Sequence, residues 1–360
     1  MGLRDAHQGW PARPRLKPIL RLLARDSRTL QFGSHPARAV LLADVEPPVR
    51  RLIESLDGTR TLEQVIAGSE IGPAAARETI ELLAVRGLLD DAAVRPVAVS
   101  TPERERLRPD LDTLSFTGTD GGAGALARRR AAQIRVYGAG RVGAQIAVLL
   151  AASGIGHLCV VDPGTARHDD VVPGGLTWND VGRPREEGAV ALVRAQTPSV
   201  NAWPGRTAAG LGDGAPAPDL VVLAPMAPLD PVLVRELAGR GLPHLLVTCH
   251  EGCGGVGPLV LPGETACLEC LDRIRGDRDP GWPALRARPG GEAACDTVLS
   301  TLVAGLAAGH ALAFVDGGRP AVSNGTVDIL PDRRWRQRSW RRHPGCPCSR
   351  NAQAALTMVA

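Results

Sequence analysis

The sequence predicts an α/β fold, a Rossmann-like doubly wound sheet, preceded by a smaller domain of short strands and helices. Three observations predict it. Strand and helix patterns alternate after residue 132, a glycine-rich motif follows the first of these strands, and two close cysteine pairs lie further along. The chain has 360 residues, of which 44% are hydrophobic, so it can bury the cores of two domains.

Composition excludes several classes of protein. The net charge of +4 is too small to indicate a nucleic-acid-binding protein. The chain begins without an apolar run, and its longest apolar stretch, 299–315, falls short of the ~20 residues that span a bilayer. We therefore expect a cytoplasmic protein with no membrane partner, in which 299–315 is a buried helix. Eight cysteines then indicate metal or thiol chemistry rather than a disulfide framework.

Residues 14–92 predict a small winged-helix domain. Its expected elements are two strands followed by three helices: 29–32, 39–43, 47–56, a helix starting at 61, and 73–86. Thr61 and Gln64 have the spacing of a capping box at the start of the second helix. A DNA-binding winged helix is the competing interpretation, but Glu78 and Glu81 on the third helix oppose phosphate contact.

Residues 93–131 are predicted to be a linker, because proline and glycine interrupt them without sustained periodicity. The second domain is predicted over 132–350. Its expected strands are 134–137, 157–162, 219–223, 245–248 and 258–261. Its expected helices are 144–152, 185–196 and 231–240. This alternation is typical of a mostly parallel sheet with helices on both faces.

A glycine motif, Gly138-x-Gly140-x-x-Gly143, lies between the first strand and the first helix of the second domain. Such a turn brings a phosphate close to the backbone and to the N–H groups of a helix N-terminus. Asp162 ends the next strand, where an acid would bind a ribose hydroxyl. These four residues predict an adenine-nucleotide site. The alternative is a sheet that retains the glycines for packing only.

The chain contains two close cysteine pairs, Cys267-x-x-Cys270 and Cys346-x-Cys348, with 75 residues between them. Each pair presents two thiolates on one turn, and together they predict a tetrahedral structural zinc site. His343 is an alternative ligand in the second pair, and a set of free or disulfide-capable thiols is the alternative to a metal site.

Three further cysteines and one basic segment have two interpretations each. Cys249 and Cys253 follow a strand end and Cys295 precedes a helix, so each is either a reactive thiol or an inert one. Residues 333–342 mix arginine with tryptophan. They form either a surface for an anionic partner or an edge strand leading to the second cysteine pair, and we favour the edge strand.

Residues 134–348 resemble the ubiquitin-activating-enzyme-like superfamily of ThiF, MoeB and HesA. The resemblance is carried by the glycine motif, by the two cysteine pairs, and by the segments 152–156, 161–162 and 180–185. It implies adenylation of a peptide or small-protein carboxylate with ATP and magnesium, a structural zinc, and a possible homodimer. No Asn-x-x-Arg run occurs in 171–178, and Arg185 stands where the family has a lysine. No catalytic residue is identified, and Arg185 and Cys295 are the candidates.

The N-terminal domain resembles the PqqD type of peptide-recognition domain. That resemblance implies that a leader peptide adds a strand beside 38–44 and packs on the helix 73–86, with Val40, Leu42 and Arg77 as contacts.

The two domains together resemble the leader-binding partner of azole-forming cyclodehydratases, which modify thiazole/oxazole (TOMM) peptides, including bacteriocins. The resemblance implies a scaffold that binds the precursor and docks a YcaO-type enzyme, with a degenerate adenylation site. The alternatives are an active ThiF-type adenylyltransferase and a nicotinamide-dependent oxidoreductase, in which the cysteine pairs have no role.

Overall fold

The computed structural model describes residues 10–205, 216–225, 229–287 and 295–348, and the chain divides into two compact units after Ala127. The segment 93–131, which we predicted to be a linker, contains helices. They are α4 (Thr101–Arg106), α5 (Arg108–Leu114), the 3-10 turn η1 (Ser115–Thr117) and α6 (Ala123–Ala131). Ser100 caps α4 by accepting the Glu103 N–H. Helices this short show too few turns for a periodic apolar pattern to be recognised.

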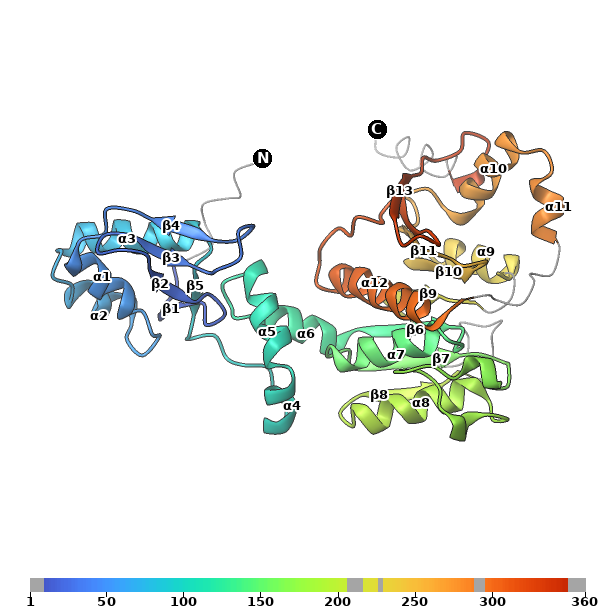
Figure 1. Ribbon diagram of the computed structural model, residues 1–360, viewed down its shortest axis with the longest axis horizontal. Coiled ribbons are helices and arrows are strands. Elements are labelled where there is room, and N and C mark those ends of the chain that lie inside the picture. Colours follow the sequence, from blue (N-terminus) through green and yellow to red (C-terminus); the bar gives the residue numbers. More distant parts are fainter. Residues whose placement is uncertain (1–9, 206–215, 226–228, 288–294, 349–360) are drawn as a thin grey trace, which may run out of the picture. The chain divides into compact units, whose positions relative to one another are not determined.

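Residues 14–91 of the N-terminal unit form two small sheets and three helices packed on one core (Figure 1). The strands β2 (Leu22–Ala24), β3 (Leu30–Phe32) and β4 (Val40–Leu42) form an antiparallel sheet with β4 at one edge, and β1 (Pro14–Leu16) pairs with β5 (Leu89–Asp91). The helices are α1 (Pro47–Glu54), α2 (Leu62–Ala67) and α3 (Pro73–Val85). The capping box predicted at Thr61 and Gln64 is present at the start of α2.

The C-terminal unit is built on one sheet of eight strands (Figure 1). These are β6 (Gln133–Tyr137), β7 (His157–Val161), β8 (Asn201–Pro204), β9 (Leu220–Leu223), β10 (His244–His250), β11 (Cys253–Val260), β12 (Gly325–Ile329) and β13 (Trp335–Ser339). Their order is β13-β12-β11-β10-β9-β6-β7-β8. The strands from β8 to β10 are parallel, and those from β10 to β13 are antiparallel. The sheet is therefore mixed rather than mostly parallel, and β13 is an edge strand.

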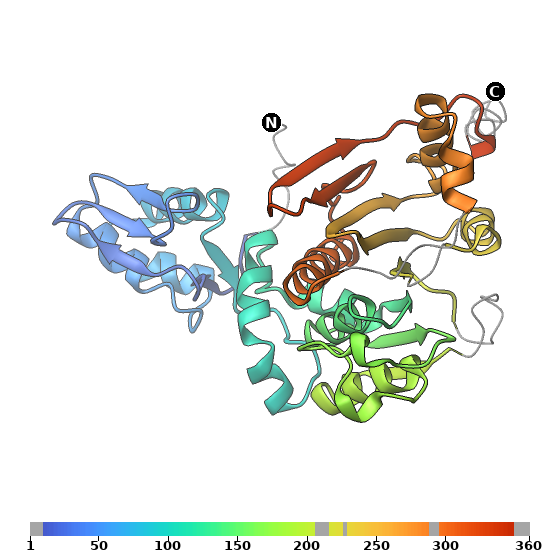
Figure 2. The same cartoon turned by 45° about the vertical axis from the view of Figure 1, so that its right-hand side comes forward.

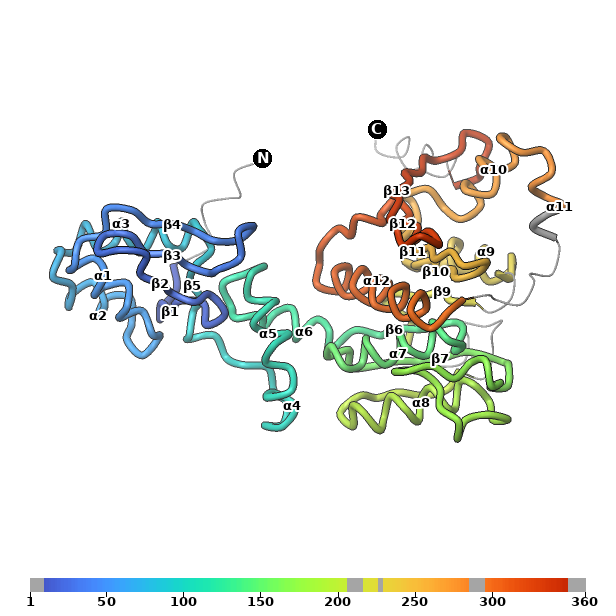
Figure 3. Tube along the Cα trace, viewed as in Figure 1, coloured from blue at the N-terminus to red at the C-terminus, as the bar shows by residue number. Residues whose placement is uncertain are grey.

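Helices cover both faces of this sheet (Figures 2 and 3). They are α7 (Gly143–Ala152), α8 (Arg185–Gln196), α9 (Pro231–Gly239), α10 (Leu268–Arg278), α11 (Trp282–Ala287) and α12 (Thr297–Val315), with the 3-10 turns η2 (His168–Asp170) and η3 (Trp178–Asp180). Successive residues of a strand pack in different cores, one on each face of the sheet. Val222 packs in the core with α7, α8 and α12, whereas its neighbour Leu223 packs in the core with α9 and α10. This two-sided burial explains why the parallel strands are continuous apolar runs.

Helix α12 is long and apolar enough to cross a membrane by length and composition, as core helices of globular proteins also are. Leu299, Val303, Ala307 and Ala311 are buried in the core shared with α7. We predicted a buried helix at 299–315, and this packing confirms burial for one face of the helix only, because Leu302 and Gly305 on the other face are exposed.

Candidate functional site

The glycine motif forms the turn between β6 and α7. Gly138 has a φ of +95°, and a Cβ placed on it would lie 2.0 Å from the carbonyl oxygen of Ala224. A Cβ on Gly143 would lie 1.8 Å from the carbonyl oxygen of Gly138. Both glycines are required by the packing of the turn itself. Their presence alone therefore does not show that a nucleotide binds.

Asp162 lies at the end of β7, directly beside this turn, and is 3% exposed. Its Oδ2 accepts the N–H of Ala139 at 2.7 Å, and its Oδ1 accepts the N–H of Gly164 at 2.8 Å. Arg185 donates to both oxygens, from Nε to Oδ2 at 3.0 Å and from Nη2 to Oδ1 at 2.9 Å. A carboxylate offers about four acceptor positions. Among the described residues, these four donors fill them.

Arg185 is the first residue of α8, and it occupies the carboxylate of Asp162, which was predicted to bind a ribose hydroxyl. Its Nη1 is also 3.4 Å from the carboxylate of Asp170, which is 1% exposed. Burial lowers the pKa of Arg185, but its hydrogen bonds to Asp162 and the two carboxylate charges outweigh burial and raise it. The guanidinium is thus a fixed cation between two buried acids.

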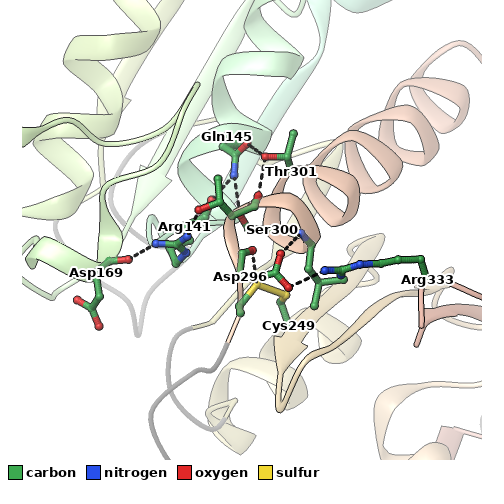
Figure 4. The surroundings of a disulfide bond; sticks show 11 residues. Arg141, Gln145, Asp169, Cys249, Asp296, Ser300, Thr301 and Arg333 are labelled. Carbon is green, nitrogen blue, oxygen red and sulfur yellow. Dashed lines mark hydrogen bonds and ion pairs between the residues drawn. A yellow bond between two sulfur atoms is a disulfide. The ribbon is translucent and has the colours of Figure 1, made fainter. Parts of the chain in front are cut away.

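A second arginine, Arg141, lies inside the glycine motif and crosses to α12 (Figure 4). It donates to the carbonyl oxygen of Asp169 at 2.6 Å and to the hydroxyl of Thr297 at 2.7 Å. A small pocket opens beside it at the carboxyl ends of β6, β9 and β10, where ligand sites of α/β sheets lie. The pocket is lined by Arg141, Val142, Ala224, Pro225, Val247, Cys249 and Cys295. Arg141 was not among the residues predicted for the site, although its place within the glycine motif was a signal for it.

Cys295 forms a disulfide with Cys249 in this pocket, with the two Cα atoms 5.8 Å apart. This corrects two expectations. Cys295, a candidate catalytic thiol, is not a free thiol in this structure, and the cysteines include one disulfide as well as a possible metal site. The two cysteines are separated by 46 positions in the sequence, and no spacing signal predicts the bond. Cys253 is free and half-buried on β11.

The four cysteines predicted to bind zinc come together. Cys267 and Cys270 begin α10, whereas Cys346 and Cys348 follow β13, and the four sulfur atoms lie within 4.8 Å of one another. Neighbouring sulfurs are 3.3–3.7 Å apart. A tetrahedral zinc with Zn–S bonds near 2.3 Å places its sulfurs about 3.8 Å apart, so the arrangement fits a divalent metal.

Electrostatics within the cluster favour a thiolate. The pKa of Cys270 is lowered to about 4, chiefly because the Cys267 S–H donates to its sulfur, and the same bond raises the pKa of Cys267. The backbone N–H of His343 also donates to the Cys270 sulfur. The His343 ring instead lies 2.9 Å from the carboxylate of Asp277, so His343 is a supporting residue rather than the alternative ligand.

The predicted peptide contacts lie on two elements of the N-terminal unit. Val40 and Leu42 are half-buried on β4 and pack against the core that includes Ile80 of α3. Leu41, between them, is 51% exposed. Arg77 is exposed on α3.

This chain is similar to a known protein family and to one curated protein. The sequence model of the ThiF family matches residues 111–348. Protein HesA of Nostoc sp. (strain PCC 7120 / SAG 25.82 / UTEX 2576) is 28% identical over 189 residues, which cover 50% of this chain and 73% of HesA.

Two solved structures of MccB are also similar. E. coli MccB with ATP has a TM-score of 0.73 and 15% identity over 93% of this chain and 99% of MccB. The microcin C7 biosynthetic enzyme MccB in complex with N-formylated MccA has a TM-score of 0.73 and 16% identity over the same shares. At these identities the likeness shows a shared fold.

Proposed function

The chain belongs to the ThiF family, and we propose that it is a leader-peptide-binding and docking scaffold for the modification of a ribosomal peptide. Its adenylation site is then degenerate. The observation that carries this proposal is the saturated carboxylate of Asp162, whose acceptor positions are filled by Arg185 and two backbone N–H groups. A ribose hydroxyl would have to displace one of these donors.

The cations of the site support the same conclusion. An adenylation site must stabilise the charge that develops on the transferred phosphoryl group. This requires hydrogen-bond donors that already point at that group before the reaction. Arg185 is held by Asp162 and Asp170, and Arg141 is held by a carbonyl oxygen and Thr297. Lys17 is the only lysine of the chain, and it belongs to the N-terminal unit.

Peptide binding is assigned to the N-terminal unit, which we take to be winged-helix-like. MccB, which shares the fold, was solved with the peptide MccA. In this chain a leader peptide would add a strand to the edge of β4 and contact Val40, Leu42 and Arg77. Exposed apolar side chains on these elements, Leu41 on β4 and Val85 on α3, suit an apolar peptide.

Docking is assigned to the ThiF domain. The partner we propose is a YcaO-type cyclodehydratase that makes azoles in a TOMM or bacteriocin precursor in the cytoplasm. Zinc at Cys267, Cys270, Cys346 and Cys348 would have a structural role, because four protein ligands leave no open coordination position. A homodimer through the ThiF domain is compatible with this arrangement.

An active adenylyltransferase is the second candidate. It is favoured by the intact turn at Gly138 and Gly143 and by the fold shared with MccB, which was solved with ATP. In that case Arg185 would release Asp162 when ATP and magnesium bind.

Proline substitutions in β4 test the peptide site. Successive amides of a strand point to opposite sides, so Val40→Pro and Leu41→Pro remove one N–H that faces β3 and one that faces the open edge. We expect the outward-facing substitution to abolish binding of a synthetic leader peptide, measured by fluorescence anisotropy, while the circular dichroism spectrum stays unchanged. Retained affinity in both folded variants would contradict the assignment of this edge.

Substitution of Arg185 tests the degenerate site. Lysine keeps the charge between Asp162 and Asp170, but its compact ammonium cannot span both oxygens of Asp162. One acceptor becomes free for a ribose hydroxyl, and we expect Arg185→Lys to bind ATP with magnesium about tenfold more tightly than the wild type. Titration calorimetry measures this. Arg183→Lys, an exposed neighbour, is the matched control and should not change the affinity. Tighter binding by the wild type than by Arg185→Lys would favour the adenylyltransferase.

A further inference from the structure

The disulfide between Cys249 and Cys295 joins the end of β10 to the start of α12 (Figure 4). Cys249 is half-buried, Cys295 is 8% exposed, and both line the pocket beside the glycine motif. The disulfide is therefore part of the pocket wall, at the end of the sheet where the nucleotide site was predicted.

The start of α12 is also held by side chains from other elements. Arg141 donates to the hydroxyl of Thr297, and the amide oxygen of Gln145 on α7 accepts from the hydroxyl of Thr301 at 3.0 Å. The N-cap residue Asp296 accepts the N–H of Leu299 at 2.9 Å and pairs with Arg333. All four contacts are polar, and two of them, Arg141–Thr297 and Asp296–Arg333, are exposed to solvent. Leu299 of the same turn packs in the core, and the disulfide is the covalent restraint on the chain just before it.

The sheet separates this pair from the other cysteines. Cys249 and Cys295 belong to the core formed with α7 and α12, whereas Cys159 and the four-cysteine cluster belong to the core on the opposite face. Cys253 lies opposite His250 across the β10–β11 ladder, while Cys249 lies opposite Gly254. Adjacent positions of a strand point to opposite faces, so Cys253 points away from Cys249.

We propose that Cys249 and Cys295 form a reversible thiol–disulfide site, whose reduction by a dithiol protein of the thioredoxin class releases the first turn of α12 and loosens the pocket. A reversible bond is expected in the cytoplasmic location proposed above, because the disulfides of cytosolic proteins are usually catalytic or redox-sensing. The proposal does not depend on whether the pocket binds a nucleotide.

The chemistry is a two-electron exchange. A thiolate of the reductant attacks the sulfur of Cys249, which is the more accessible one, and Cys295 leaves as a thiolate. The second thiol of the reductant then attacks the mixed disulfide, and Cys249 leaves. Cys249 and Cys295 each gain one electron and one proton, and the reductant becomes a disulfide. Cys295 then lies at the N-terminus of a 19-residue helix, where the helix dipole favours the thiolate needed for reoxidation.

Hydrogen exchange of the full-length, metal-loaded protein tests this proposal. Reduction with thioredoxin should yield two additional free thiols, assigned by mass spectrometry to Cys249 and Cys295. Exchange at the amides of 298–301 should become about tenfold faster, while amides in the β6–β7 pair keep their protection. Cys249→Ser and Cys295→Ser should show the fast exchange without reductant, and Cys253→Ser should behave as the wild type. Metal content is measured in each sample to show that the four-cysteine cluster is intact.

Two results would overturn the proposal. The first is that both thiols stay free after treatment with oxidised glutathione. The second is that the disulfide forms and is reduced while the exchange rate at 298–301 stays the same. Because neither readout involves ATP or peptide, either failure is distinguishable from failure of the proposed function.

Discussion

Replacing Lys17 with methionine is expected to destabilise the N-terminal unit by about 3–5 kcal/mol, because it leaves a buried carboxylate without its counter-ion. Lys17 and Asp90 are each 1% exposed, and the ammonium donates to the Asp90 carboxylate. It also donates to the carbonyl oxygens of Ser115 and Gly118. The lysine thus ties β1 and β5 to the turn that follows α5.

Urea unfolding, monitored by hydrogen exchange at the amides of 15–16 and 89–91, measures this effect in the intact chain. Arg15→Met is the matched control, because Arg15 is 38% exposed and its Nη2 lies 3.9 Å from Asp90. Such a pair contributes about 1 kcal/mol or less. The double variant Lys17→Met with Asp90→Asn should recover part of the loss, since no buried charge remains. Equal losses for Lys17→Met and Arg15→Met would contradict the importance of this ion pair.

Replacing Cys267 with serine is expected to release the metal and lower the free energy of unfolding by more than about 4 kcal/mol, as loss of a structural metal does. The cluster connects α10 to the segment after β13, whose Trp340 packs in the same core and donates to the Thr326 hydroxyl at 2.8 Å. Without the metal, this segment loses its covalent anchor to α10.

Elemental analysis and tryptic cleavage after Arg341 and Arg342 follow the two effects separately. Metal content should fall from one equivalent to none, and cleavage should become at least about tenfold faster. Cys253→Ser, outside the cluster, should retain the metal and the slow cleavage. A wild-type protein purified without metal, and insensitive to a chelator, would refute the site.

Local sequence signals predicted much of the fold. The glycines of the motif and the capping box at Thr61 are fixed by contacts within a few residues, and the structure contains both. The proposed zinc ligands were found because a metal site needs two close cysteine pairs, whatever their separation in the chain.

Features made by distant partners were not predicted. Strands β1 and β5 are three residues each, too short for an alternating pattern, and they pair Pro14 with Asp91 across most of the N-terminal unit. The sequence also showed that Arg185 replaces an expected lysine, but not that its guanidinium would bind Asp162. That contact depends on the close approach at Gly164, where a Cβ would lie 2.1 Å from the arginine.

ATP–pyrophosphate exchange distinguishes a ThiF-family scaffold, which binds a peptide without activating it, from an adenylyltransferase. The assay uses metal-loaded protein saturated with a leader peptide that it binds, at millimolar ATP and magnesium. The assay is run with the Cys249–Cys295 bond intact and after its reduction. We predict no exchange above the protein-free rate in either state, because Asp162 has no acceptor free for the ribose and both arginines of the site are held. Peptide-dependent exchange would contradict the scaffold and establish an adenylyltransferase.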